Sequence, residues 1–153
     1  MKQRLTIGAA AAFTVASAAL AAPTTATGAA AGGELTYGSN ILLHNQYGGD
    51  GGYLDTNGHS TQPGATYDVS TNQTPNSRGP ATSVWKVVSA TGKTNGTRVT
   101  SGDVIYLINQ YGSGTYLDAN GHSAQPGAKY KVSTSHYTDR GTGTGTWKVL
   151  PAT

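Results

Sequence analysis

The stretch that decides the fold is residues 105–123, which read IYLINQYGSGTYLDANGHS. Residues 41–60 read ILLHNQYGGDGGYLDTNGHS, the same pattern with one more residue in the glycine-rich turn. The likeness continues through a Gln-Pro-Gly-Ala turn to a Trp-Lys-Val segment in each half of the chain. Because the match extends through turns as well as hydrophobic segments, we interpret it as an internal duplication, with copies at about 39–90 and 101–151.

Each copy contains four short segments rich in β-branched and aromatic residues, which are typical of strands. The predicted strands are 41–43, 52–55, 67–69 and 84–88 in the first copy, and 104–108, 115–118, 130–132 and 146–150 in the second. We expect turns at the two Asn-Gly pairs, 57–58 and 120–121, and at the two Pro-Gly pairs. The sequence therefore predicts an all-β fold of two tandem four-stranded β-hairpin repeats, forming a trefoil-like unit or a small barrel or sandwich.

The first 33 residues differ in composition from the rest. Lys2 and Arg4 precede an apolar, alanine-rich stretch over residues 5–22, and small residues follow at spacings that suit signal cleavage. We expect a signal peptide and flexible segment over residues 1–33 and a single β domain over residues 34–153. The protein would then be secreted and extracellular, with no membrane span after signal removal.

Charge and cysteine content exclude several classes of protein. The chain has no cysteine, which excludes disulfides, a thiolate zinc site and a cysteine nucleophile. Loss of Lys2 and Arg4 would leave eight basic residues against seven acidic ones, with no basic run, so nucleic acid is not an expected partner. The sequence contains no phosphate-binding loop or hydrolase elbow. We expect no enzymatic activity, no cofactor and no metal.

The segment SGDVIYLINQYGSGTYL, from Ser101 to Leu117, resembles the opening of a β-trefoil repeat, particularly of the MIR type. That pattern is a Gly-Asp-Val-Ile-x-Leu strand, a glycine turn, Tyr-Leu and a later Trp-x-Val strand. MIR domains occur in protein mannosyltransferases and inositol-trisphosphate receptors, and related trefoils are often sugar-binding lectins. The resemblance implies a trefoil-like fold and a carbohydrate ligand.

The chain departs from this family in three ways. MIR repeats usually place His after Tyr-Leu, where this chain has Asp55 and Asp118, and the Gln-x-Trp signature of lectins is absent. No binding residue of the family can therefore be transferred to this chain. A trefoil also has three four-stranded units, whereas this chain has two. The open sheet edges that result must be covered, and a homo-oligomer would cover them.

The motifs Asp55-Thr-Asn-Gly and Asp118-Ala-Asn-Gly leave several interpretations open. They suggest a pair of catalytic aspartates, a calcium loop, a sugar site, or turns in which Asp caps its own backbone. The intervening Asn breaks the aspartic-protease motif, and later acidic calcium ligands are absent. We favour the structural turn over the sugar site for these residues taken alone.

The repeated Asn-Gln-Tyr tripeptide is the other candidate. Two amides beside an aromatic ring offer the directional polar contacts and the ring face that a saccharide needs, although a hairpin closure explains them equally well. The predicted carbohydrate-binding residues, one set per copy, are Asn45, Gln46, Tyr47, Asp55 and Asn57, and Asn109, Gln110, Tyr111, Asp118 and Asn120.

Together these features predict a secreted, lectin-like module with one weak site per repeat for glycans or cell-surface polysaccharide. Duplication of a weak site raises avidity without new contacts. The alternative is a secreted structural or protein-interaction module of the cell surface, including an inhibitor or toxin accessory, whose tyrosine-rich strands contact a protein.

Overall fold

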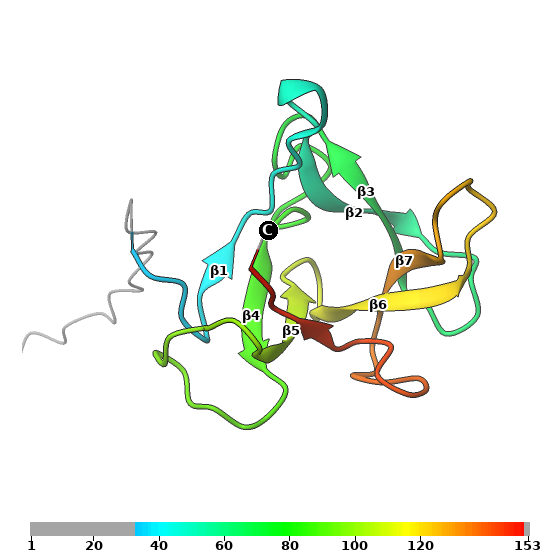
Figure 1. Ribbon diagram of the computed structural model, residues 1–153. Helices are drawn as coiled ribbons and strands as arrows, with labels where there is room; N and C mark the ends of the chain where they lie inside the picture. The colour runs from blue at the N-terminus through cyan, green and yellow to red at the C-terminus, as the bar shows by residue number, and fades with distance from the viewer. Residues whose placement is uncertain (1–32, 152–153) are drawn as a thin grey trace, which may run out of the picture.

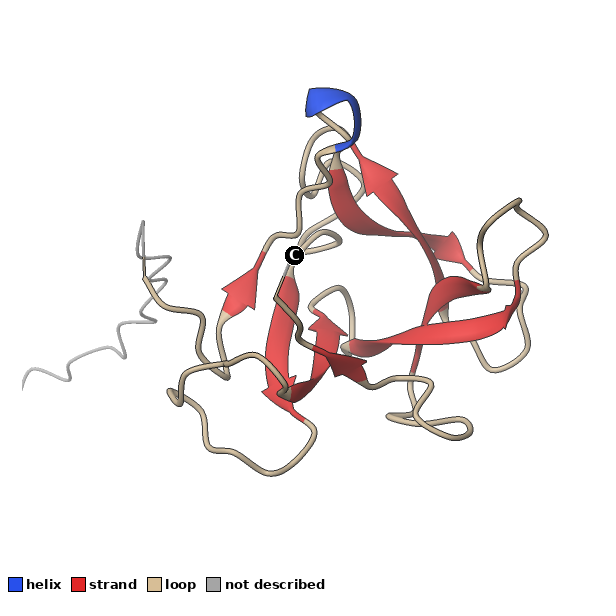
Figure 2. Ribbon diagram, in the orientation of Figure 1, coloured by secondary structure: helices blue, strands red, loops and turns tan. Residues whose placement is uncertain are grey.

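The computed structural model describes residues 33–151, which form an antiparallel β-sheet curled into a half-barrel (Figures 1 and 2). The strands are β1 (Asn40–Ile41), β2 (Tyr53–His59), β3 (Tyr67–Asn72), β4 (Trp85–Ser89), β5 (Val104–Asn109), β6 (Thr115–His122), β7 (Tyr130–Ser135) and β8 (Trp147–Lys148). A short 3-10 turn, η1 (Tyr47–Gly49), follows β1. The all-β prediction is confirmed. The predicted signal peptide lies outside the described residues, apart from residue 33.

The two copies build equivalent units. In each unit the second and third strands form a hairpin, β2 with β3 and β6 with β7. The first strand of each unit pairs with the fourth in the same register. Ile41 lies opposite Trp85 in the first copy, and Ile105 lies opposite Trp147 in the second. The structural pairing therefore follows the sequence duplication.

Two contacts join the units into one sheet. β4 of the first copy pairs with β5 of the second over five residues, from Trp85 opposite Asn109 to Ser89 opposite Ile105. The hairpins meet where β3 lies beside β7, with Asp68 opposite Ser133. β5 thus pairs with β4 on one edge and with β6 and β8 on the other (Figure 1).

The core draws its side chains from both copies. Its buried members are Tyr37, Trp85, Val87, Ile105, Leu107 and Leu117. The Trp85 indole N–H donates to the carbonyl of Leu54 at 2.9 Å, and Trp147 donates to the carbonyl of Leu117 at the same distance. Trp147 is only partly buried, whereas Trp85 is fully buried, so the matched positions differ in how completely they are covered.

The predicted turns at the Asn-Gly pairs are wrong. Gly58 and Gly121 do adopt positive φ, 60° and 55°, but they lie inside β2 and β6, where the pairing register shifts. Each is therefore part of a β-bulge, and glycine permits the positive φ there because it has no Cβ. The chain reverses later, at the Pro-Gly pairs, where the N–H of residue 65 donates to the carbonyl of residue 62 and residue 128 repeats this with residue 125.

Candidate functional site

The two aspartates of the predicted sites are buried beneath the surface. The Asp55 carboxylate accepts hydrogen bonds from Arg78 at 3.1 Å and from the Ser83 hydroxyl at 2.6 Å. Asp118 is equally buried and is bound by two guanidinium nitrogens of Arg140. Each carboxylate thus has its own arginine from the loop before the fourth strand. This arrangement holds a loop in place and leaves neither carboxylate facing a ligand.

The asparagines of the repeated tripeptide have different environments. Asn109 is fully buried, and its side-chain amide donates to the carbonyl of Thr82 at 2.8 Å. Asn45, its counterpart, is exposed. Both share one local bond, in which the side-chain oxygen accepts from the N–H two residues later, at 2.8 Å in the first copy and 3.0 Å in the second. Only Asn45 is therefore accessible to a soluble ligand.

The remaining predicted residues divide in the same way. Gln46 and Asn57 are exposed and Gln110 is partly exposed, whereas Asn120 is buried with its amide 3.3 Å from the Ser133 hydroxyl. The Gln46 amide and the Asp50 carboxylate both bond to the ring of His44 at 2.9 Å. The residues of the first tripeptide thus form a polar cluster on the surface around η1.

The two tyrosines differ most. Tyr47 is 88% exposed, whereas Tyr111 packs edge-on against Tyr67 with ring centroids 5.5 Å apart. Tyr67 in turn lies 5.1 Å from the ring of His59. Three rings from β2, β3 and the turn after β5 therefore meet where the two copies join.

These rings line a recess that we call the junction hollow, about 220 Å³ in volume, bordered by Thr56, His59, Tyr67, Arg78, Thr82 and Tyr111. Its walls combine two tyrosine rings, an imidazole, hydroxyl groups and a guanidinium. Arg78 bonds Asp55 and Ser70 through one nitrogen, Nη1. The other N–H groups of the fork are available for a ligand, because a guanidinium carries five donors.

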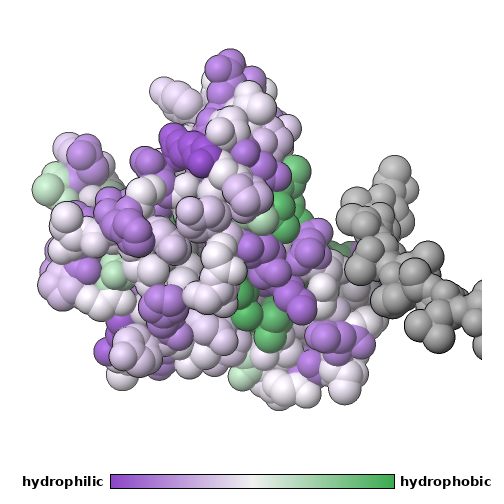
Figure 3. All heavy atoms as spheres, turned by 180° about the vertical axis from the view of Figure 1, so that it is seen from behind, coloured by the Kyte–Doolittle hydropathy of each residue, from purple (hydrophilic) through white to green (hydrophobic). Residues whose placement is uncertain are grey.

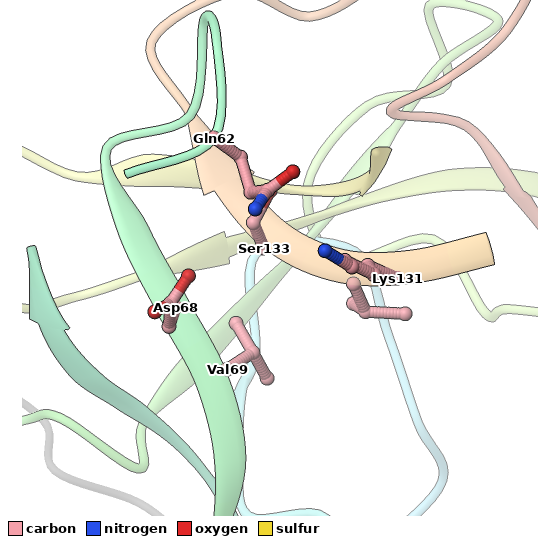
Figure 4. A pocket seen from close by; sticks show the side chains of 6 residues that line it. Gln62, Asp68, Val69, Lys131 and Ser133 are labelled. Carbon is pink, nitrogen blue, oxygen red and sulfur yellow. The ribbon is translucent and has the colours of Figure 1, made fainter. Parts of the chain in front are cut away.

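A second recess, the hairpin hollow, lies between β3 and β7 and has a volume of about 400 Å³. Figure 4 shows Asp68 and Val69 on one strand, Lys131 and Ser133 on the other, and Gln62 reaching over them from the turn. The valines and the charged residues occupy equivalent positions in the two copies, so the hollow lies between matching faces of the hairpins. It contains no aromatic ring on which a sugar could stack.

The sequence identified Tyr111 but missed most of the junction hollow. His59, Tyr67 and Arg78 are repeated in the second copy as His122, Tyr130 and Arg140, and that repetition was the available signal. It did not show that a tyrosine from one copy would pack on the hairpin of the other. Such a contact depends on how the units pair, which the spacing within one unit does not determine.

Within residues 33–151, no group of three or more histidine, aspartate and glutamate side chains is arranged to hold a metal ion. No helix in that part of the chain has the length and apolar character needed to cross a membrane. No protein-family model matches the sequence, and the searches of curated proteins and of solved structures likewise gave no significant match.

Proposed function

We propose that the protein is a secreted carbohydrate-binding module whose principal site is the junction hollow. The observation that supports this is the pair of tyrosine rings, Tyr67 and Tyr111, which come from different copies and stand beside polar donors and acceptors in one open recess. A sugar presents C–H faces that pack on aromatic rings and hydroxyls that need directional partners. The hollow offers both on a scale that suits one or two sugar units.

The charge of the site agrees with a neutral ligand. The Asp55 carboxylate offsets the positive charge of Arg78, so the hollow has no strong excess of either sign. The exposed Asn45, Gln46 and Tyr47 form a second, weaker surface of amides and one ring. Shallow sites of this kind bind weakly, and multivalent glycans should gain disproportionately.

Replacement of the ring that the second copy contributes tests the proposal. Tyr111→Ala should weaken glycan binding by about tenfold or more, because it removes the stacking surface. Tyr111→Phe should retain most of the affinity, and Tyr137→Ala, which alters an exposed tyrosine outside the hollow, should be neutral. A broad glycan array followed by calorimetry on the best ligand provides the measurement. If the folded parent protein binds nothing on the array, the carbohydrate proposal is wrong.

A protein-interaction module is the second candidate, and one observation favours it. Large apolar side chains, among them Leu42 and Leu150, are exposed at 45% and 66%. Exposed hydrophobic residues at a sheet edge are typical of a surface that binds another chain. An array without glycan binders, together with a detectable protein complex, would favour this alternative.

A further inference from the structure

The internal junction between the two copies is the pairing of β4 with β5. The counterparts of these two strands, β8 and β1, each have a free edge. β5 has β4 on one edge and β8 and β6 on the other. Its counterpart β1 has β4 and the start of β2 on one edge and no strand on the other within residues 33–151. β8, the counterpart of β4, likewise pairs with β5 alone among these residues.

The two strands with a free edge, β1 and β8, are also shorter than their counterparts. β1 extends over two residues where β5 extends over six, and β8 extends over two residues where β4 extends over five. Their sequences are closely related, since each pair comes from the duplication. The difference in length therefore follows from the absent neighbour, because hydrogen bonds to an adjacent strand hold the extended backbone in place.

The register of the internal junction predicts what these edges would present to each other. Val87 lies opposite Leu107, and Val88 lies opposite Tyr106. At the equivalent positions of the free edges, Val149 would lie opposite Leu43 and Leu150 opposite Leu42. Three of these four side chains are leucines exposed by 37% to 66%. Figure 3 shows a band of apolar side chains on the β1 side of the molecule, seen from behind.

The polar side chains repeat the same correspondence. The buried amide of Asn109 donates to the carbonyl of Thr82, and the N–H of Gln110 donates to the carbonyl of Val84 at 2.9 Å. Asn45 and Gln46 carry the same groups on the surface, and the matching carbonyls belong to Thr144 and Thr146. Asn45 thus keeps the local half of the bonding pattern and presents the other half to solvent.

The tyrosine rings also pair at the internal junction and are exposed at the free edges. Tyr111 packs on Tyr67 and close to Gly79, where an added Cβ would come within 3.3 Å of its ring. Tyr47 is 88% exposed, and Tyr130, the counterpart of Tyr67, is 45% exposed. Tyr47 and Tyr130 are therefore the two members of a second tyrosine pair, equivalent to Tyr111 and Tyr67, that do not contact each other within one chain.

We propose that β8 of one protomer pairs with β1 of a second copy, in the register of the internal β4–β5 junction, to give a head-to-tail homo-oligomer. The occupant of each edge is a second copy because the complementary leucines, amides, carbonyls and tyrosines all belong to this chain. A heterologous contact of this kind forms closed rings, of which a dimer is the smallest, or longer assemblies.

The contact would also complete a second hollow. Tyr47 of the partner subunit would stand beside Tyr130, His122 and Arg140, as Tyr111 stands beside Tyr67, His59 and Arg78. His122 and Tyr130 already lie 5.2 Å apart in the arrangement of their counterparts. The self-association proposal does not depend on carbohydrate binding, since it concerns the protein without a ligand.

Mass measurements test the contact directly. Sedimentation or light scattering of the purified protein, without sugar, should give a mass above that of the monomer that falls on dilution. Leu42→Lys and Leu150→Lys should each weaken association by about tenfold or more, because each places a charge in the contact. Leu35→Lys, at a leucine with 38% exposure that lies on neither edge, is the matched control and should leave the mass unchanged.

The absence of cysteine allows a test of the register that does not depend on the lysine variants folding. A Leu42→Cys chain mixed with a Leu150→Cys chain should form mixed disulfides readily, because residues opposite each other in an antiparallel pair are close enough to bridge. Leu42→Cys mixed with Lys148→Cys, two residues out of register, should form far fewer. A monomeric mass at every concentration, or equal cross-linking in both mixtures, would overturn the proposal.

The outcomes separate the two proposals. An oligomer that binds no glycan contradicts only the carbohydrate proposal. A monomer that binds glycan and loses binding with Tyr111→Ala contradicts only the self-association proposal.

Discussion

The two buried aspartates are supported unequally. Asp55 has both an arginine and the Ser83 hydroxyl, whereas the position equivalent to Ser83 in the second copy is Gly145. The hydrogen bonds to the Asp118 carboxylate come from Arg140 alone among the described side chains. Arg140 also donates to the carbonyl of Pro63 at 2.8 Å, and so connects the second copy to the first.

Removal of the arginine should therefore be more costly in the second copy. Arg140→Ala leaves a buried carboxylate without a partner and should lower the free energy of unfolding by about 3–5 kcal/mol. Arg78→Ala should cost less, since the Ser83 bond remains. Urea unfolding followed by tryptophan fluorescence measures both variants. Equal losses, or a larger loss for Arg78→Ala, would contradict the assignment.

Individual residues were predicted from sequence only in part. The tripeptides around Asn45 and Asn109 are identical, so one role was expected for both, yet one asparagine is exposed and the other is buried. The cause is the segment that leads into β4, whose carbonyls at Thr82 and Val84 accept hydrogen bonds from Asn109; within residues 33–151 no such segment lies beside Asn45. A duplicated sequence specifies equal local structure, while burial depends on which neighbour each copy has.

At the scale of elements, the connection between the copies is held by one carboxylate. The ammonium of Lys93, together with the backbone N–H of Thr100 and the hydroxyl of Tyr37, holds the pKa of Asp103 well below its usual range. The Tyr37 bond measures 2.8 Å and the Thr100 bond 2.9 Å. Asp103 thereby connects the segment before β1, the loop after β4 and the start of β5.

A lowered pKa in the folded state gives a defined pH dependence. The ionised Asp103 stabilises the fold fully above its ordinary pKa, and this contribution is lost as the pH falls toward the lower folded pKa. The thermal midpoint of the parent should therefore fall between about pH 5 and pH 2. Asp103→Asn should be less stable at pH 7 and lose less on acidification. Asp68→Asn, at an exposed carboxylate, is the control and should follow the parent curve.

Strands were predicted more successfully than turns. β3, β5, β6 and β7 contain the whole of their predicted segments, and β2 and β4 begin one residue later than predicted. The Asn-Gly pairs were misassigned because positive φ suits a bulge as well as a turn, and only the position of the partner strand distinguishes the two. The Pro-Gly pairs reverse the chain, as their fixed and permissive backbone angles favour.

At the scale of the whole molecule, the two copies depend on each other. The core places Trp85 and Val87 of the first copy against Ile105 and Leu107 of the second. The sequence predicted the number of units and their strands, but not their closure, since closure depends on contacts between units. Neither copy buries its apolar face by itself, a property common to repeat architectures.

A single copy should therefore fail to fold as a monomer. A peptide of residues 101–151 lacks the strand that pairs beside Leu107, which leaves apolar surface in water, and it lacks the Thr82 carbonyl, so Asn109 could be buried only without its partner. Its circular dichroism should show no cooperative thermal transition, and a peptide of residues 33–100 added in equal amount should restore one. The peptide retains β8, which the proposed contact uses, and β5, the counterpart of β1, whose edge toward β4 is left free. Any folded material in the peptide alone should consequently have the sedimentation mass of several chains. A monomeric peptide that unfolds cooperatively would show that each copy is an independent domain, and the interdependence argued from the shared core would then be wrong.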